Sequence, residues 1–322
     1  MNWNAIDWAA LERMRAAFLE GTAGAGDYWQ SESDLASYDA TFAQRIGWKW
    51  DYVLAELTRR GWAPPRGELL DWGCGSGIAH RAFLDHFGAE PVTQLRLVDR
   101  SELAVHYASR RAKERFPNLD VACGQPGSPA LLLLSHVLTE LNPHAFETLI
   151  ALAHRASAVI WVEPGTHDAS RALIAVREKL RGDFHVIAPC THQAACGMLV
   201  SGNERHWCHH FAALPAGVFT DSNWGRFAHL AGIDLRSLPV SFLVLDRRPP
   251  PSLPAGAVRV IGRPRVYKAH ALLLGCDESG VRERRLDKRQ LPEVFRRAKK
   301  DELDPLQVWR CDGDVIAETR AL

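Results

Sequence analysis

The sequence has no long apolar run and no strong net charge. Its longest uninterrupted apolar stretches, such as residues 130–134, fall far below the ~18 residues that a membrane span requires. The first twenty residues carry Asp7 and Glu12 and lack a cationic start followed by an apolar block. We therefore expect a cytoplasmic protein with no membrane partner. The charge of +1 identifies no partner, and we expect a monomer.

Disulfides are also not expected, because seven cysteines in a reducing compartment argue against a disulfide framework. They are instead core thiols or metal ligands. The 322 residues are 47% hydrophobic and 24% charged, which is typical of a folded protein with one large domain and appendages or with two domains.

Three regions follow one another along the chain. Residues 1–65 predict a helical N-terminal region, with helices at 2–20 and 35–60 separated by a flexible break at 21–26. Residues 66–248 then alternate short apolar runs with helical stretches, which predicts an α/β domain with a parallel sheet. The expected strands are 68–72, 94–98, 120–123, 130–135, 158–162, 184–188 and 241–246, and the expected helices are 80–86, 102–115, 144–155 and 169–180.

The C-terminal region begins after the three prolines at 249–251, which predict a stiff linker. Residues 249–322 contain strand-like pieces at 257–261, 269–274 and 307–311 and one helical stretch at 291–300. This pattern predicts a small β-rich unit.

A glycine loop follows the first expected strand, in the order Asp71-Trp72-Gly73-Cys74-Gly75-Ser76-Gly77. Glycines allow a sharp turn and close approach to a ligand, and the helix that follows offers free N–H groups. The dinucleotide pattern G-x-G-x-x-G does not occur here, because the third position is Ile78. Asp99 ends the second strand, 22 positions after Gly77, where a carboxylate suits ribose hydroxyls.

Together these residues resemble the class I S-adenosylmethionine-dependent methyltransferases. The resemblance implies a Rossmann-like sheet and S-adenosylmethionine as cofactor. It also implies a set of candidate cofactor-binding residues: Asp71, Gly73, Gly75, Gly77, Asp99 and Ser135.

Catalytic residues are not identified by the sequence. The segment after the fourth strand, residues 135–141, contains neither the Asn/Asp-Pro-Pro-Tyr motif of amino-group methylases nor a cysteine nucleophile. His136 is either a general base or a structural hydrogen-bonding residue. Cys123, at the end of the third strand, is expected to be a small core residue.

A group of cysteines with metal-ligand spacing lies in residues 186–225, where Cys190, Cys196 and Cys208 fall within 19 residues. Thiolates bind soft metals, and a metal can hold a segment that has no core of its own. Spacing alone leaves zinc and an iron–sulfur cluster open. It also leaves the fourth ligand open among Cys276, Cys311, His192, His206, His209 and His210.

The order of these motifs resembles the methyltransferase-like assembly factors of the small ribosomal subunit, known in mitochondria and bacteria. The resemblance covers residues 35–315 and rests on the cysteines, the segment 207–209, and the segments 135–141, 162–166 and 268–276. It implies a structural [4Fe–4S] cluster on Cys190, Cys196, Cys208 and Cys276, with Cys311 as a spare thiol. Thr191 and Gly197 replace prolines frequent in that family, and zinc stays the alternative metal.

The charge is unevenly distributed. Residues 247–300 contain 15 lysines and arginines against 5 acidic residues, a net +10, which leaves −9 for the rest. Such a segment favours phosphate binding. Arg259, Arg263 and Arg265 with Tyr267 and Lys268 predict contact with single-stranded or irregular ribosomal RNA.

Three functions fit these features. The first is a methyltransferase acting on the small ribosomal subunit or its rRNA. The second is a non-catalytic assembly factor that binds the cofactor and rRNA. The third is a small-molecule methyltransferase with a structural zinc site.

Overall fold

The computed structural model describes residues 2–20, 29–125 and 127–322, and these form two compact units. Unit 1 comprises residues 1–163 and 212–239, and unit 2 comprises residues 164–211 and 240–322. The chain therefore runs from unit 1 into unit 2, returns to unit 1 and ends in unit 2. The three consecutive regions predicted from the sequence, with boundaries at 65 and 248, do not include this crossing. The expected break at 21–26 lies outside the described residues. No described helix is long and apolar enough to cross a membrane.

The N-terminal helices of unit 1 begin at side chains that accept backbone hydrogen bonds. Asp7 caps the first helix through the N–H of Ala10, and Ser31 caps the second. The expectation of one helix over 35–60 is wrong, because the backbone at Thr41 is not helical and its hydroxyl donates to the carbonyl of Ser37. The elements are η1 (Trp3–Ala5), α1 (Trp8–Leu19), α2 (Glu32–Ala40) and α3 (Phe42–Arg59).

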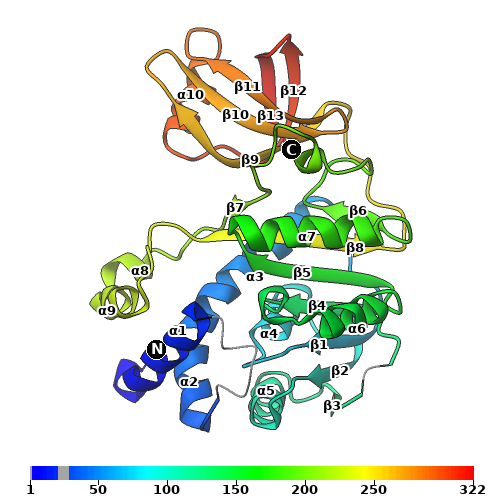
Figure 1. Cartoon of the computed structure of the whole chain (residues 1–322), viewed down its shortest axis with the longest axis vertical. Coiled ribbons are helices and arrows are strands. Elements are labelled where there is room, and N and C mark those ends of the chain that lie inside the picture. The colour runs from blue at the N-terminus through cyan, green and yellow to red at the C-terminus, as the bar shows by residue number, and fades with distance from the viewer. Residues whose placement is uncertain (1, 21–28, 126) are drawn as a thin grey trace. The chain divides into compact units, whose positions relative to one another are not determined.

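Five parallel strands of unit 1 lie in the order β3-β2-β1-β4-β5, and this confirms the predicted methyltransferase-like α/β sheet (Figure 1). Residues 131–134 are all buried, as expected for a strand covered on both faces. The strands are β1 (Gly67–Trp72), β2 (Val92–Val98), β3 (Val121–Cys123), β4 (Leu131–Ser135) and β5 (Ala158–Pro164). The helices between them are α4 (Ile78–Phe87), α5 (Glu102–Arg115) and α6 (Pro143–Ala153), with η3 (Leu138–Glu140) after β4.

The returning segment of unit 1 forms two short helices that the sequence did not predict, α8 (Gly217–Thr220) and α9 (Ser222–Ala231). They pack against the N-terminal helices in one apolar cluster that includes Leu11, Met14 and Phe227. The Trp3 indole N–H donates to Asp221 Oδ2 at 2.7 Å. The N-terminal helical region thus has a packing partner that is far away in the sequence, 218 residues apart for Trp3 and Asp221.

Unit 2 begins with α7 (His167–Leu180) and a small group of strands. These are β6 (His185–Ala188), which is antiparallel to β8 (Pro239–Asp246), and the two-residue β7 (His210–Phe211), which also pairs with β8. Between β6 and β7 the chain has only the short η4 (Gly197–Leu199). Residues 189–211, called the cysteine segment below, therefore have little regular structure.

The C-terminal part of unit 2 is a closed five-stranded barrel in the order β10-β11-β13-β12-β9 (Figure 1). All its neighbouring strands are antiparallel except β11 and β13, which are parallel. This confirms the small β-rich unit. The elements are β9 (Ala257–Val266), β10 (His270–Asp277), β11 (Gly280–Asp287), α10 (Pro292–Lys299), β12 (Leu306–Asp312) and β13 (Val315–Ala321).

The packing of α9 predicts the effect of a core substitution. Phe227 is fully buried and meets the Phe42 ring edge-on, with ring centroids 4.9 Å apart. We expect Phe227→Ala to lower the free energy of unfolding by about 3–5 kcal/mol, measured by urea denaturation, because it leaves a cavity between α3 and α9. Phe219→Ala, at a 59% exposed residue of α8, is the matched control and should change little. Equal effects of the two substitutions would contradict this packing.

Candidate functional site

The glycine loop of unit 1 joins the end of β1 to the start of α4. Gly73, Gly75 and Gly77 all have positive φ, at 69°, 51° and 83°. A Cβ on Gly73 would lie 2.6 Å from Val137 Cγ1, and one on Gly77 would lie 2.4 Å from His80 Cε1. Gly75 instead has no heavy atom within 4 Å of its Cβ position. Packing therefore requires glycine at positions 73 and 77, and the positive φ favours glycine at position 75.

A buried acid–imidazole pair lies directly beneath this loop. Asp71 Oδ2 and His80 Nδ1 are 2.7 Å apart, and both side chains are fully buried. Asp71 Oδ1, His80 Nε2 and the Ser76 hydroxyl are also buried and lack hydrogen-bond partners within the described residues. Buried polar atoms normally have partners, so this part of the loop still has hydrogen-bonding capacity for a polar ligand.

Asp99 holds the loop from the neighbouring strand. Its Oδ2 accepts the N–H of Gly75 at 2.9 Å, and its Oδ1 accepts the N–H of Ser101 at 3.0 Å. Burial raises the pKa of Asp99, although these two hydrogen bonds oppose the shift. Each carboxylate oxygen has a second lone pair, so ribose hydroxyls can still bind there. The loop and Asp99 lie at the carboxyl edge of β1 and β2, beside the strand-order reversal between β1 and β4, where ligands bind in open α/β sheets.

The end of β4 carries Ser135 and His136. The Ser135 hydroxyl accepts the indole N–H of Trp50 at 2.9 Å. His136 has φ of 57°, an uncommon conformation for a residue other than glycine, and is partly exposed. Its Nε2 lies 3.3 Å from Nζ of the buried Lys49 on α3. Strained backbone of this kind is often found at functional sites.

Glu163, at the end of β5, fixes the backbone that follows His136. Its Oε1 accepts the N–H groups of Val137 and Leu138 and the indole N–H of Trp161, at 2.7–3.1 Å. Its Oε2 is buried and has no partner among the described residues. Sequence reasoning missed Lys49, which belongs to no motif, and gave Glu163 no role, although it lies in the segment 162–166 that supports the family resemblance.

Burial shifts the ionisation of these three groups. It lowers the pKa of Lys49 to about 7. The charge of Arg45 lowers this pKa further, whereas the charge of Glu163 raises it. Burial also raises the pKa of Glu163 to about 7, although the hydrogen bonds that its carboxylate accepts lower this pKa. Burial and then Lys49 hold the pKa of His136 well below its ordinary value. This shift makes the imidazole a weaker base than a free histidine, so a hydrogen-bonding role suits it better than proton abstraction.

The cysteine segment of unit 2 packs against the outside of the barrel. Cys196 and Cys276 lie in one apolar cluster with Ile174, Met198 and Ile261. Cys208, Leu274 and Val281 pack against that cluster. Burial raises the pKa of the Cys276 thiol, and Cys190, Cys208 and Cys196 raise it further. The four cysteines that the family resemblance selects are therefore electrostatic neighbours.

Backbone contacts fix the segment in this position. The carbonyl of Cys208 accepts the hydroxyls of Ser170 and Ser241, at 2.8 and 2.7 Å. A Cβ on Gly197 would lie 2.6 Å from the backbone nitrogen of Val281, so the segment approaches the β10–β11 turn closely. Buried Arg177 of α7 donates to the carbonyl of Ala194 at 2.8 Å. Although burial lowers the pKa of Arg177, Cys190 and Cys196 raise it.

Two histidines adjoin the thiols. His192 Nε2 lies 3.5 Å from Cys276 Sγ, and His210 Nε2 lies 3.7 Å from Cys208 Sγ. Within residues 2–20, 29–125 and 127–322, no group of three or more His, Cys, Asp or Glu side chains has the arrangement of a metal site. The sulfur-rich donor set nevertheless suits a soft metal. Thr191 Oγ1 and His192 Nδ1 are buried without partners among the described residues.

The remaining cysteines lie elsewhere. Cys123 is exposed at the end of β3, so the expectation of a core residue is wrong. β3 has only three residues, none of them buried, which is why it does not cover its own thiol. Cys311 packs among the apolar side chains of the barrel with Trp309, apart from the thiol cluster.

The positive charge of residues 247–300 is more nearly balanced in the structure than the net charge of +10 for this segment indicates. Acidic residues beyond residue 300 pair with two of its arginines, in Arg263–Asp301 and Arg284–Asp314. Arg265 pairs with Glu283 on β11. Arg259 is buried, with its Nε 3.4 Å from His210 Nδ1, so it does not reach the surface. The exposed positive charge is therefore smaller and more local than expected.

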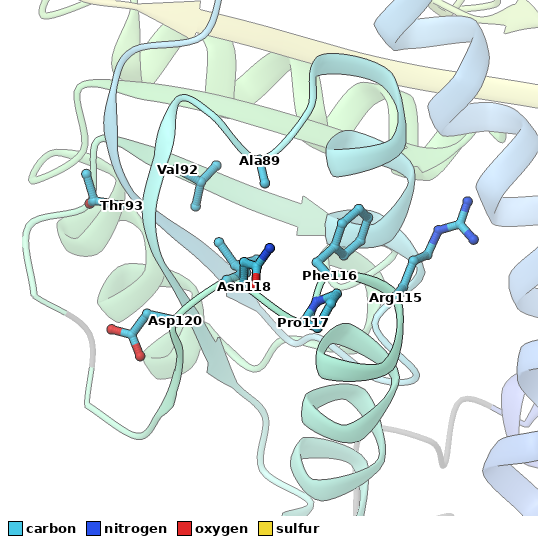
Figure 2. A pocket seen from close by; sticks show the side chains of 9 residues that line it. Ala89, Val92, Thr93, Arg115, Phe116, Pro117, Asn118 and Asp120 are labelled. Carbon is cyan, nitrogen blue, oxygen red and sulfur yellow. The ribbon is translucent and has the colours of Figure 1, made fainter.

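An open pocket of about 390 Å³ lies between the start of β2 and the segment before β3; Figure 2 shows the side chains that line it. Val92, Thr93 and Phe116 are among its lining residues. It lies at the amino edge of β2, whereas the glycine loop and Asp99 lie at the carboxyl edge. This pocket is therefore separate from the candidate cofactor site.

Comparison with known proteins identifies one family. The family model described as mitochondrial small ribosomal subunit Rsm22 matches residues 53–304, more than half of the chain. None of the curated proteins matches the sequence significantly.

Two solved structures match the chain at low sequence identity. One is magnesium protoporphyrin IX methyltransferase from Synechocystis PCC 6803 with bound S-adenosylmethionine. It has 14% identity and a TM-score of 0.40, and the match covers 74% of this chain and 97% of that one. Another is the plantazolicin methyltransferase BpumL with S-adenosylhomocysteine, at 13% identity and a TM-score of 0.40, covering 74% and 98%.

The burial of Lys49 predicts a pH dependence of stability. An amine whose pKa falls from 10.5 to about 7 on folding binds fewer protons in the folded state, so its contribution makes stability rise with pH between those values. We expect the free energy of unfolding to rise more steeply with pH in the wild type than in Lys49→Met. The difference between the two slopes should be about 1.4 kcal/mol per pH unit between pH 7.5 and 9.5. Urea denaturation at several pH values measures both slopes.

The matched control is Lys113→Met, at an exposed lysine of α5 in the same unit. It should keep the slope of the wild type. A slope in Lys49→Met equal to that of the wild type would show that Lys49 is protonated in the folded protein.

Proposed function

Because the chain belongs to the Rsm22 family of the mitochondrial small ribosomal subunit, we propose that it is an S-adenosylmethionine-dependent, methyltransferase-like protein that acts on the small ribosomal subunit or its rRNA. The family match, combined with the glycine loop at the carboxyl edge of a parallel sheet, carries this proposal. We also propose that the chain holds a structural [4Fe–4S] cluster. The cytoplasmic location expected from the sequence stays a prediction.

The proposed cofactor site consists of Asp71, Gly73, Gly75, Gly77, Asp99 and Ser135. The open space at Gly75 lets a ligand approach the backbone, and the N-terminus of α4 favours a negatively charged group such as a carboxylate. Asp99 is near enough to Gly75 to share a ligand with the loop. When bound, S-adenosylmethionine supplies an electrophilic methyl group, and the protein orients it and excludes water.

His136 is the proposed hydrogen-bonding residue on the acceptor side of this site. Its imidazole is partly exposed at the end of β4, and Gly73 of the loop packs against Val137, the next residue. Glu163 fixes the backbone at Val137 and Leu138, so the imidazole starts from a defined position. Lys49 Nζ lies 3.3 Å from Nε2, and when its N–H donates there, Nδ1 carries the ring proton and can donate to a substrate.

The proposed cluster would be held by Cys190, Cys196, Cys208 and Cys276. Burial, and after it the neighbouring thiols, raise the pKa of Cys196, Cys208 and Cys276, so these thiols do not readily ionise alone, and a metal centre would relieve this by binding them as thiolates. The cluster would supply a covalent connection between the cysteine segment and β10. His192 and His210 adjoin the sulfurs, and zinc with a mixed donor set is the alternative.

A non-catalytic assembly factor is the second candidate function. It is favoured by the two backbone hydrogen bonds that Asp99 already accepts, because they give the carboxylate a structural role without a reaction. The segment 135–141 also lacks a known acceptor motif. In this function the cofactor shapes or regulates the protein.

One experiment distinguishes the two functions. We expect the full chain, incubated with methyl-labelled S-adenosylmethionine and immature small ribosomal subunits, to transfer label to RNA. Asp99→Ala should bind the cofactor at least about tenfold more weakly, because a charged hydrogen-bond acceptor is lost. Asp120→Ala, at an exposed aspartate before β3, is the matched control. Tight cofactor binding without transfer would support the assembly factor, and no binding would contradict both.

The metal proposal predicts a specific response to two cysteine substitutions. We expect an anaerobic preparation to be brown and to contain about four irons and four sulfides per chain. Cys276→Ser should lose most of the iron and increase proteolysis of residues 247–322, because the barrel loses its connection to the cysteine segment. Cys311→Ser, at a barrel cysteine outside the cluster, should keep both. A colourless protein with one tightly bound zinc would contradict the iron–sulfur assignment.

A further inference from the structure

The barrel of unit 2 has the strand order of a known nucleic-acid-binding architecture. Its five strands run β9-β10-β11-β13-β12 around the barrel, and α10 lies between the third and fourth strands of the sequence. This resembles the OB-fold, in which the outer face of strands two and three binds oligonucleotides, together with adjacent loops. Strand order alone is an analogy, so the ligand must be argued from the side chains.

One end of that outer face is already covered. Along β10, Ala271 and Leu273 point into the barrel core, whereas Leu274 and Cys276 contact the cluster of the cysteine segment. Val281, the β11 partner of Cys276, lies in the same contact. The cysteine segment therefore occupies the end of the face near the β10–β11 turn, and a ligand has access only to the other end.

The accessible end combines an apolar strip with paired arginines. Leu272 lies between Arg265 of β9 and Arg285 of β11 in the strand register. Both arginines are exposed and each pairs with a carboxylate, Glu283 and Asp287 respectively. Such exposed pairs are weak and exchange readily for a phosphate.

An exposed aromatic pair adjoins this strip at the β9–β10 turn. The rings of Tyr267 and His270 stack at 4.8 Å between centroids with an interplanar angle of 15°. Tyr267 is 48% exposed, although large aromatic side chains usually bury more of their surface. The N–H of Tyr267 donates to the carbonyl of His270 at 2.8 Å, so the two rings share one tight turn.

Cationic side chains surround the aromatic pair. Lys268 lies inside the turn and is exposed. The backbone of Lys288 donates to the carbonyl of Ala269, which brings the end of β11, with exposed Lys288 and Arg289, beside the same turn. Positive charge next to an exposed ring plane is the combination that binds a nucleic-acid backbone and an unpaired base together.

We infer that Tyr267, His270, Leu272 and the cations around them form a short binding site for single-stranded RNA. One base stacks on the Tyr267–His270 pair, a second lies over Leu272, and Lys268 and Lys288 contact phosphates. Paired bases offer no free face to an aromatic ring, so an RNA duplex binds more weakly. This inference rests on the proposed function, because it identifies the part of the protein that contacts rRNA.

The test uses the full chain and a labelled single-stranded RNA of about ten nucleotides, in fluorescence anisotropy titrations at several salt concentrations. We expect Tyr267→Ala to weaken binding about tenfold or more, and Tyr267→Phe to keep binding, because the ring remains. Lys268→Ala should reduce the slope of log affinity against log salt by about 0.7. Phe219→Ala removes a ring from unit 1 that is 59% exposed, more than Tyr267, and should have no effect.

The outcomes separate this site from the proposed function. If the wild type binds RNA and Tyr267→Ala binds equally well, the aromatic site is wrong while the rRNA-directed function stands. If the wild type prefers a duplex of equal length, the stacking mode is wrong. If the wild type binds neither RNA nor small ribosomal subunits, both proposals fail.

Discussion

Contact between the cysteine segment and the outside of the barrel is the constraint on which the organisation of unit 2 depends. The segment has almost no regular structure and cannot form a core of its own. It is held by hydroxyls on the Cys208 carbonyl, by a close approach at Gly197, and by thiols that gather over β10. Protonated thiols contribute only weak contacts, so the proposed metal would be the strongest interaction of this segment.

This contact also decides how much of the barrel can bind a ligand. The segment covers Leu274 and Cys276, and it leaves Leu272 and the turn at Tyr267 accessible. Unit 1 has a different task, because its glycine loop and Asp99 lie at the carboxyl edge of its own parallel sheet. The proposed cofactor site and the proposed RNA site thus lie on different units of one chain.

Much of the fold could be predicted from the sequence, for a physical reason. Strands buried on both faces, such as residues 131–134, are continuous apolar runs bounded by turns. By contrast β11, Gly-Val-Arg-Glu-Arg-Arg-Leu-Asp, carries charges at five of eight positions and buries only Leu286, so its pattern does not predict a strand. Glycine and cysteine spacings identified candidate ligands, but Lys49 resembles a surface lysine, and only the tertiary packing reveals its burial against His136.

The most direct test of the central claim is an anaerobic crystal structure with anomalous diffraction measured at the iron absorption edge. The account predicts one strong iron signal between β10 and the cysteine segment, with the sulfurs of Cys190, Cys196, Cys208 and Cys276 at bonding distance. Well-ordered thiols that point away from one another, with no iron or zinc between them, would contradict it. The packing of the cysteine segment on the barrel would then depend on apolar contacts alone.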